Sequence, residues 1–249
     1  QRQMCIRDRI RTELMPDSSE VVPYDHAGIP LYIRAAHLAS YYNMCAPCHW
    51  HDDIEWIYII TGKMRYYVNG KRLILNEGDS LMVNARQMHY GYAFEQQDCY
   101  FLCILFHPSL FGNNQILQEK YFLPFFENTS LEFHHFYSND EAGVKVGRYL
   151  QEVLLLKEDS DSGYELGVIS CMLELWSFLI RTDLLSAAKN KSESEQELNI
   201  QKDMVSFIYQ HYPEKISLTD IAAAGHVGRS KSVSYTHLRA HATSAHLVC

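Results

Sequence analysis

Three side chains of the types that bind metal ions stand close together in the sequence HWHDDIEWIYIITG, which begins at His49. Side chains of a β-strand alternate between its two faces, so His49, His51 and Glu55 share one face of an extended strand. Imidazole and carboxylate groups on one face can bind a divalent metal that activates a substrate. They can equally line a polar ligand pocket without a metal, and the residues leave both interpretations open.

The residues around this cluster predict short, closely spaced strands, at residues 56–60, 64–68, 71–75, 80–83 and 99–106. The second and third of these flank Asn69-Gly70, a dipeptide that tolerates positive φ at both centres of a type I′ turn. Many short antiparallel strands in close succession favour a small barrel or jelly roll. Such a barrel would hold the cluster on its inner wall.

Beyond Phe111 the apolar period changes from that of a strand to that of a helix. Helices are predicted over residues 144–157 and 166–179, and the second is apolar on most sides. A helix of that kind is buried against another helix or against a second subunit. Residues 187–197, AAKNKSESEQE, have no apolar periodicity and predict a linker.

The last region has the plan of a helix-turn-helix unit. Ile200, Met204 and Ile208 mark an apolar helix face, and Ser217 can cap a second helix by accepting the N–H of Asp220. Gly225 is expected to take the left-handed turn that ends this helix. A further helix start is predicted at Ser230.

Two sequence patterns resemble cupin motifs. His49-x-His51, three residues, Glu55, six residues and Gly62 resemble the first motif without a mismatch. The stretch from Gly78 to His89 resembles the second, but Asn84 and Arg86 stand where that motif usually has Pro and Gly. With the helical segment, the linker and ISLTDIAAAGHVGRSK (216–231), the order of elements is similar to that of AraC-type transcriptional regulators.

The resemblance implies an α+β fold. An N-terminal cupin β-barrel (jelly roll) is followed by a helical dimerisation segment and then by the start of an all-α helix-turn-helix domain. In that family the barrel senses a small molecule, neighbouring helices form a homodimer, and the C-terminal domain binds promoter DNA. The expected effector pocket, for a small molecule such as a sugar, contains His49, His51, Glu55, Tyr58, Tyr66 and His89.

The same resemblance adds His89 to the possible metal ligands. His49, His51, Glu55 and His89 then form a site with three histidines and one carboxylate, suited to Mn, Fe, Ni or Zn. The alternatives are a metal-free sensor pocket and a metal-dependent cupin enzyme such as an isomerase or dioxygenase. Because a lone cupin enzyme has no use for a helix-turn-helix start, the regulator, with no catalytic residues, is the favoured prediction.

The resemblance also implies DNA-binding residues near the C-terminus, at Ser217, Thr219, Arg229, Ser230 and Lys231. Ser230 would cap the recognition helix and Lys231 would lie in its first turn. The side chains expected to enter the major groove would follow these two. The sequence departs from the family there, so the DNA-binding domain is expected to be truncated.

Both ends of the sequence carry a signature of sequencing adapters. Residues 4–8, MCIRD, can be encoded by ATG-TGT-ATA-AGA-GAC, whose reverse complement encodes VSYTH, the residues at 233–237. This string resembles the end of a transposon-based adapter, so both tails are excluded from fold analysis. The expected segments are an adapter-like tail (1–9), a cupin ligand-sensing barrel (10–112), a helical dimerisation segment (113–186), a linker (187–197), a partial helix-turn-helix (198–231) and a second adapter-like tail (232–249).

A genomic prediction follows from the complementary codons. The intact gene is expected to diverge from this sequence after Lys231 and to continue into a basic recognition helix and a second helix-turn-helix. Sequencing the chromosomal locus checks this. A locus that encodes SVSYTHLRAH at this place would show that the tail is native.

The charge and hydropathy of the chain narrow the class of protein further. Its net charge is −8, and without the two tails it is near −11. Because nucleic acids are anionic, this balance argues against a surface that coats nucleic acid. No apolar run reaches the roughly 18 residues of a membrane span, so no membrane partner is expected. The N-terminus lacks the apolar stretch of a secretory signal, and a cytoplasmic location is therefore predicted.

Overall fold

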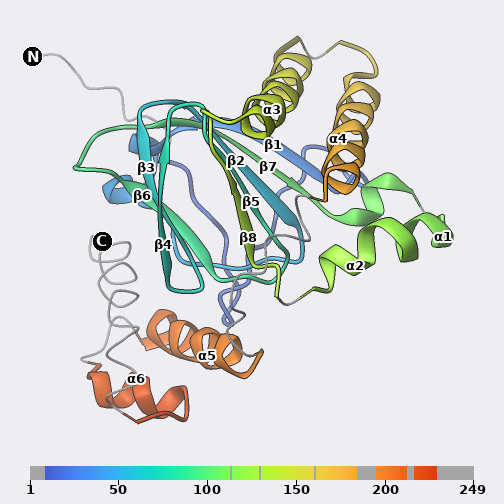
Figure 1. The fold of residues 1–249 in the computed structure, drawn as a ribbon. Coiled ribbons are helices and arrows are strands. Elements are labelled where there is room, and N and C mark those ends of the chain that lie inside the picture. Colours follow the sequence, from blue (N-terminus) through green and yellow to red (C-terminus); the bar gives the residue numbers. More distant parts are fainter. Residues whose placement is uncertain are drawn as a thin grey trace, which may run out of the picture.

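A computed structural model describes residues 9–112, 114–128, 130–159, 161–183, 195–211 and 216–228. The described chain contains two antiparallel sheets that face each other as a barrel, with helices α1 to α6 outside it (Figure 1). The strands are β1 (Leu31–His37), β2 (Ile54–Thr61), β3 (Lys63–Val68), β4 (Lys71–Asn76), β5 (Ser80–Val83), β6 (His89–Ala93), β7 (Tyr100–Phe106) and β8 (Phe133–Phe136). This confirms the α+β fold class and the N-terminal cupin-type barrel.

The eight strands form two sheets of unequal size. The larger sheet has the order β1-β7-β2-β5-β8 and the smaller has the order β4-β3-β6. The turn between β3 and β4 has positive φ at both Asn69 (47°) and Gly70 (80°), as the type I′ turn predicted from this dipeptide requires. Antiparallel pairing of Val68 with His89 then places the start of β6 beside the end of β3.

The barrel interior is apolar along most of its length. Its buried side chains come from both sheets and include Ile57, Ile59, Met64, Leu75 and Leu81. Strand alternation explains the other face of β2, where Ile54, Trp56 and Tyr58 point away from the interior. This outer face is covered by two helices.

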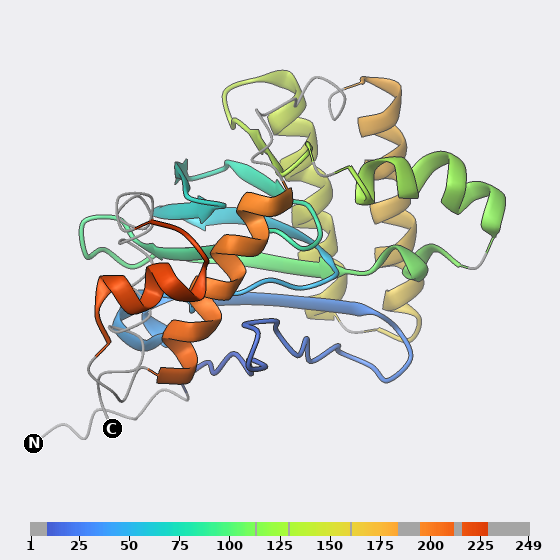
Figure 2. The ribbon, with the colours of Figure 1, turned by 90° about the horizontal axis from the view of Figure 1, so that it is seen from below.

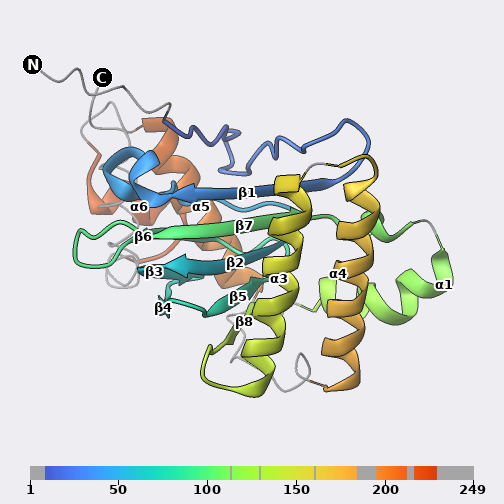
Figure 3. The same ribbon diagram turned by 90° about the horizontal axis from the view of Figure 1, so that it is seen from above.

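Those helices are α3 (Glu141–Asp159) and α4 (Tyr164–Arg181), which lie side by side across the larger sheet (Figure 3). The shorter helices α1 (Gln115–Leu117) and α2 (Leu123–Phe126) lead from β7 toward β8. The boundary expected after residue 112 needs correction, because β8 pairs with β5 and belongs to the barrel sheet. Its sequence, FHHF, has no clear strand alternation, so the sequence alone does not indicate this strand.

Helices α5 (Glu195–His211) and α6 (Leu218–Ala224) lie on the opposite side of the barrel from α3 and α4 (Figures 1 and 2). Met204 and Ile208 of α5 are buried in one apolar cluster with Tyr67 and Tyr90 of the smaller sheet. The predicted linker lies largely outside the described residues, and α5 begins within its last part, at Glu195.

The end of α6 differs from the prediction. Gly225 has φ −83°, and the neighbouring His226 takes the positive φ, 52°. Close packing explains the glycine instead, because a Cβ at this position would lie 2.6 Å from Cγ of Met204. The capping box is formed as expected, with the N–H of Asp220 donating to Ser217 Oγ and the N–H of Ser217 donating to the Asp220 carboxylate.

Candidate functional site

The predicted cluster comes together at one end of the barrel. His49 and His89 form an isolated antiparallel bridge, each N–H donating to the carbonyl of the other residue. His51 lies just before β2, and Glu55 points into the barrel from β2 itself. One ligand-type atom from each of His49, His51, Glu55 and His89 lies within 4.8 Å of the others, and all four residues are buried.

Backbone contacts fix the orientation of the three imidazoles. Nδ1 of His49 lies 2.8 Å from the carbonyl of Pro47, and Nδ1 of His89 lies 2.8 Å from that of Gln87. Nδ1 of His51 lies 3.1 Å from the carbonyl of Asp53. A carbonyl only accepts, so each Nδ1 carries the proton and each Nε2 faces the centre of the cluster. This is the arrangement in which histidines bind metals.

The carboxylate of Glu55 is the common partner of this centre. Its Oε2 lies 3.1 Å from Nε2 of His51 and 2.7 Å from Nε2 of His89, while its Oε1 accepts the hydroxyl of Tyr66 at 2.7 Å. Burial alone would raise the pKa of Glu55, but the imidazoles of His89 and His51 outweigh it and hold the pKa well below its usual range. Glu55 is therefore an anion in a buried site.

The residues fit a divalent cation. Nε2 of His89 is fully buried and has no hydrogen-bond partner of suitable geometry among the described residues, although a carboxylate oxygen of Glu55 lies 2.7 Å away. Burial lowers the pKa of His89, although the Glu55 carboxylate opposes this effect. A divalent cation at the centre would accept the Nε2 lone pairs of neutral imidazoles and balance the charge of the Glu55 carboxylate. His49, His51, Glu55 and His89 would hold it, as a Lewis acid able to bind a ligand oxygen.

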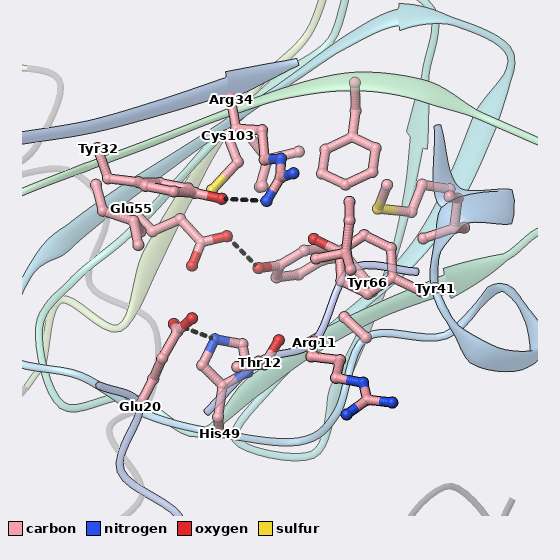
Figure 4. A pocket seen from close by; sticks show the side chains of 18 of the residues that line it. Arg11, Thr12, Glu20, Tyr32, Arg34, Tyr41, His49, Glu55, Tyr66 and Cys103 are labelled. Carbon is pink, nitrogen blue, oxygen red and sulfur yellow. Dashed lines mark hydrogen bonds and ion pairs between the residues drawn. The ribbon is translucent and has the colours of Figure 1, made fainter. Parts of the chain in front are cut away.

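A second carboxylate, which the sequence did not indicate, joins the cluster. Glu20 comes from the N-terminal segment before β1, and its Oε2 lies 3.2 Å from Nε2 of His49 (Figure 4). Burial lowers the pKa of His49, but the Glu20 carboxylate outweighs this and raises it to about 9. The N–H of Glu20 also donates to the carbonyl of Trp50, which anchors this segment beside the site. No motif marks Glu20; only the fold brings it here.

A cavity of about 70 Å³ opens between the two sheets next to the cluster (Figure 4). His49, Glu55 and Tyr66 of the predicted pocket line it, and Tyr66 also stacks nearly parallel to the ring of His89. His51 and His89, the other two histidines of the cluster, do not line the cavity. Polar residues that the sequence analysis missed complete the lining: Arg11, Thr12, Glu20, Tyr32, Arg34 and Tyr41.

Tyr58 does not lie in the predicted pocket. It is three residues from Glu55 on the same strand, so it points to the opposite face of the sheet. There it packs in the cluster beneath α3 and α4, and its hydroxyl accepts a hydrogen bond from Gln151 Nε2 of α3. Its predicted role in ligand binding is wrong for this geometric reason.

The predicted DNA-binding residues are only partly described. Ser217 caps α6, and Thr219 is exposed in its first turn. Arg229, Ser230 and Lys231 lie outside the described residues. None of the described helices combines the length and the apolar character needed to cross a membrane.

Comparisons with known proteins agree with this fold. Residues 33–175 match the family model of the AraC-like ligand-binding domain, which is more than half of the chain, and the chain belongs to this family. An uncharacterized HTH-type transcriptional regulator, YdeC of Bacillus subtilis (strain 168), is 28% identical over 193 residues. The match covers 78% of this chain and 65% of that regulator, so the chain spans about 65% of its relative's length.

Similar solved structures include a Cupin 2 conserved barrel domain protein from Leptotrichia buccalis. It is 22% identical, with a TM-score of 0.29, and the match covers 32% of this chain and 38% of that one. Another is ToxT from Vibrio cholerae O395, solved with a naphthalenyl butenoic acid. It is 9% identical, with a TM-score of 0.42, and the match covers 84% of this chain and 76% of that one.

Proposed function

We propose that this chain is the sensing part, and the beginning of the DNA-binding part, of a ligand-responsive transcription regulator that acts in the cytoplasm. One observation carries the proposal: a barrel of the AraC-like ligand-binding family encloses a polar cavity and is followed by the capped helix pair α5–α6. The intact gene completes the helix-turn-helix unit beyond Lys231. A small-molecule effector in the cavity and promoter DNA are the two partners.

The contact between the barrel and α5 supplies a route for regulation. Lys202 of α5 lies 3.8 Å above the ring of Trp50, whose carbonyl accepts the N–H of Glu20. Ser206 Oγ and Gln210 Nε2 of α5 donate to the carbonyl of Pro16 in the N-terminal segment. These contacts can have two arrangements, and an effector that binds one of them more tightly shifts the protein toward it. The difference in effector affinity between the two arrangements sets how far DNA binding changes.

The buried histidine cluster favours a second candidate, a metal-dependent cupin enzyme. A metal held by His49, His51, Glu55 and His89 has the Lewis acidity that such an enzyme needs. In the regulator, the same metal would instead bind the effector. The helix pair α5–α6 favours the regulator, because catalysis in the barrel does not require it.

The experiment that tests the function is selection of bound sequences from a random duplex DNA library with the protein encoded by the intact gene. A regulator enriches a common motif, and mutation of that motif abolishes binding. Failure to enrich any motif would refute the regulator.

We also propose that the regulator is a homodimer that associates through α4. Leu166 and Leu173 of α4 are 73% and 40% exposed, and Ile180 follows at the same seven-residue spacing. Such a spacing is typical of helices that pack along one another. An apolar groove of about 310 Å³ runs beside this face, lined by Leu117, Tyr121, Phe122, Leu173, Trp176 and Ile180.

Leu173→Glu is expected to weaken the dimer more than about tenfold, because association would bury the new carboxylate in a groove whose lining is mostly apolar. Light scattering over a range of protein concentrations measures this. Ile74→Glu is the control, because Ile74 is 45% exposed on β4 of the other sheet. A monomeric wild-type protein, or equal effects of the two substitutions, would contradict dimerisation through α4.

A further inference from the structure

The acidic groups on the wall of the cavity are already engaged with histidines. Glu20 pairs with His49 (Figure 4). Glu55 contacts both His51 and His89. A ligand at this end of the cavity therefore meets carboxylates that already contact imidazoles, together with the Tyr66 hydroxyl. The charge of the opposite wall then decides what kind of ligand fits.

That wall carries Arg34, a residue of β1. Leu31 and Ile33 point toward the helices, and the alternation of the strand turns Tyr32 and Arg34 toward the cavity. Arg34 Nη1 lies 3.5 Å from the hydroxyl of Tyr32, and within the described part of the chain no carboxylate forms an ion pair with its guanidinium. Arg34 is also exposed, so a ligand from solvent can reach it.

A guanidinium without a counter-ion on a cavity wall has a definite chemical complement. Its planar fork of N–H donors matches the two oxygens of a carboxylate, and such bidentate contacts are among the stronger hydrogen bonds in proteins. Neutral ligands would leave this charge unpaired.

We infer that the effector is a small carboxylic acid that bears hydroxyl groups. Its carboxylate binds the guanidinium of Arg34, and its hydroxyls face the other end of the cavity, where Glu55, Tyr66 and His49 offer acceptors and donors. The volume of about 70 Å³ limits its size, since pockets for drug-sized ligands reach about 300–1,000 Å³. This inference rests on the proposed sensor function and specifies its ligand class.

Calorimetric titration with matched probes tests the inference. The acids are lactate, glycerate and glucuronate, and their neutral counterparts are propane-1,2-diol, glycerol and glucose. Glycerol 3-phosphate represents the phosphate class. At least one acid is expected to bind, and its neutral counterpart to bind at least about tenfold more weakly, as the loss of hydrogen bonds between charged groups implies.

Arg34→Gln is expected to weaken binding of that acid about tenfold or more, and, as an exposed substitution, to leave the fold intact. Arg65→Gln is the control, because Arg65 stacks on Tyr92 and Phe94 outside the barrel. The inference is overturned if no acid binds, if the neutral probe or glycerol 3-phosphate binds as tightly as the acid, or if Arg34→Gln has no effect. The DNA selection tests the regulator and does not depend on these titrations, which test the effector class. Either of these two proposals can therefore be refuted while the other is supported.

Discussion

Purified protein is expected to contain about one divalent metal ion per chain, and His51→Ala is expected to lose it. His51 is buried, and its Nε2 faces the same centre as those of His49 and His89. Removing a ligand should weaken metal binding by more than about 100-fold, because outer-shell partners alone are typically worth 10–100-fold. Elemental analysis by mass spectrometry, after dialysis without chelator, measures the metal content.

Two further variants separate loss of the metal from loss of the fold. His26→Ala removes a histidine that pairs with Glu165 at the surface, and it should retain the metal. His51→Gln keeps a side chain of similar length in the buried site and should also lose the metal while unfolding at nearly the wild-type temperature. If the wild-type protein folds and binds its effector without metal, the metal site is refuted and the histidine cluster is only part of a polar pocket.

Replacing Trp56 by Ala is expected to reduce the free energy of unfolding by about 3–5 kcal/mol, the usual cost of deleting a fully buried large aromatic side chain. Trp56 is completely buried, and its ring stacks on Phe136 of β8 at 5.6 Å between centroids. A loss of this size is a large part of the roughly 5–15 kcal/mol that stabilises a typical domain. Urea denaturation followed by circular dichroism measures it.

Trp56→Phe is the matched comparison. Phenylalanine keeps a ring against Phe136 and removes the buried indole N–H, which has no hydrogen-bond partner among the described residues. Its cost should therefore be much smaller than that of the alanine variant. Equal costs for the two variants, or a loss below about 1 kcal/mol for Trp56→Ala, would contradict a tightly packed contact between β2 and β8.

The spacing of polar residues indicated which side chains come together in the candidate site, although they do not share one strand as the sequence predicted. A bend at residues 52–53 separates His49 and His51 from Glu55 of β2, and the second motif added His89 from a distant strand. Strand alternation, applied to Tyr58, would have placed it on the outer face. Tyr32 and Arg34 also alternate with Leu31 and Ile33, a signal of an inward-facing pair that the sequence analysis did not use.

Other parts of the site and fold depend on tertiary contacts that leave no local pattern. Glu20 reaches His49 because Ser19, in the segment before the barrel, forms an isolated parallel bridge with Trp50. Strand β8 forms by pairing with β5, and His135 within it contacts Asp79 at 3.2 Å. A four-residue strand with two central histidines has no apolar alternation from which it could be recognised.

The proposed regulator function requires DNA binding by a completed helix-turn-helix unit. Between Asn199 and Lys231 the cations are Lys202, Lys215, Arg229 and Lys231, and Lys202 is already stacked on Trp50 of the barrel. The proposed recognition helix would start at Ser230, so we expect specific recognition of base edges to need the residues that the intact gene encodes beyond Lys231.

Fluorescence anisotropy with the duplex selected from the library tests this most directly. The protein from the intact gene should bind it with a dissociation constant on the order of 10⁻⁸ M or tighter, weakening steeply as salt is raised. Residues 1–249 should show no preference between this duplex and one with a scrambled motif. Equal, sequence-specific binding by residues 1–249, or no specific binding by the product of the intact gene, would contradict the account.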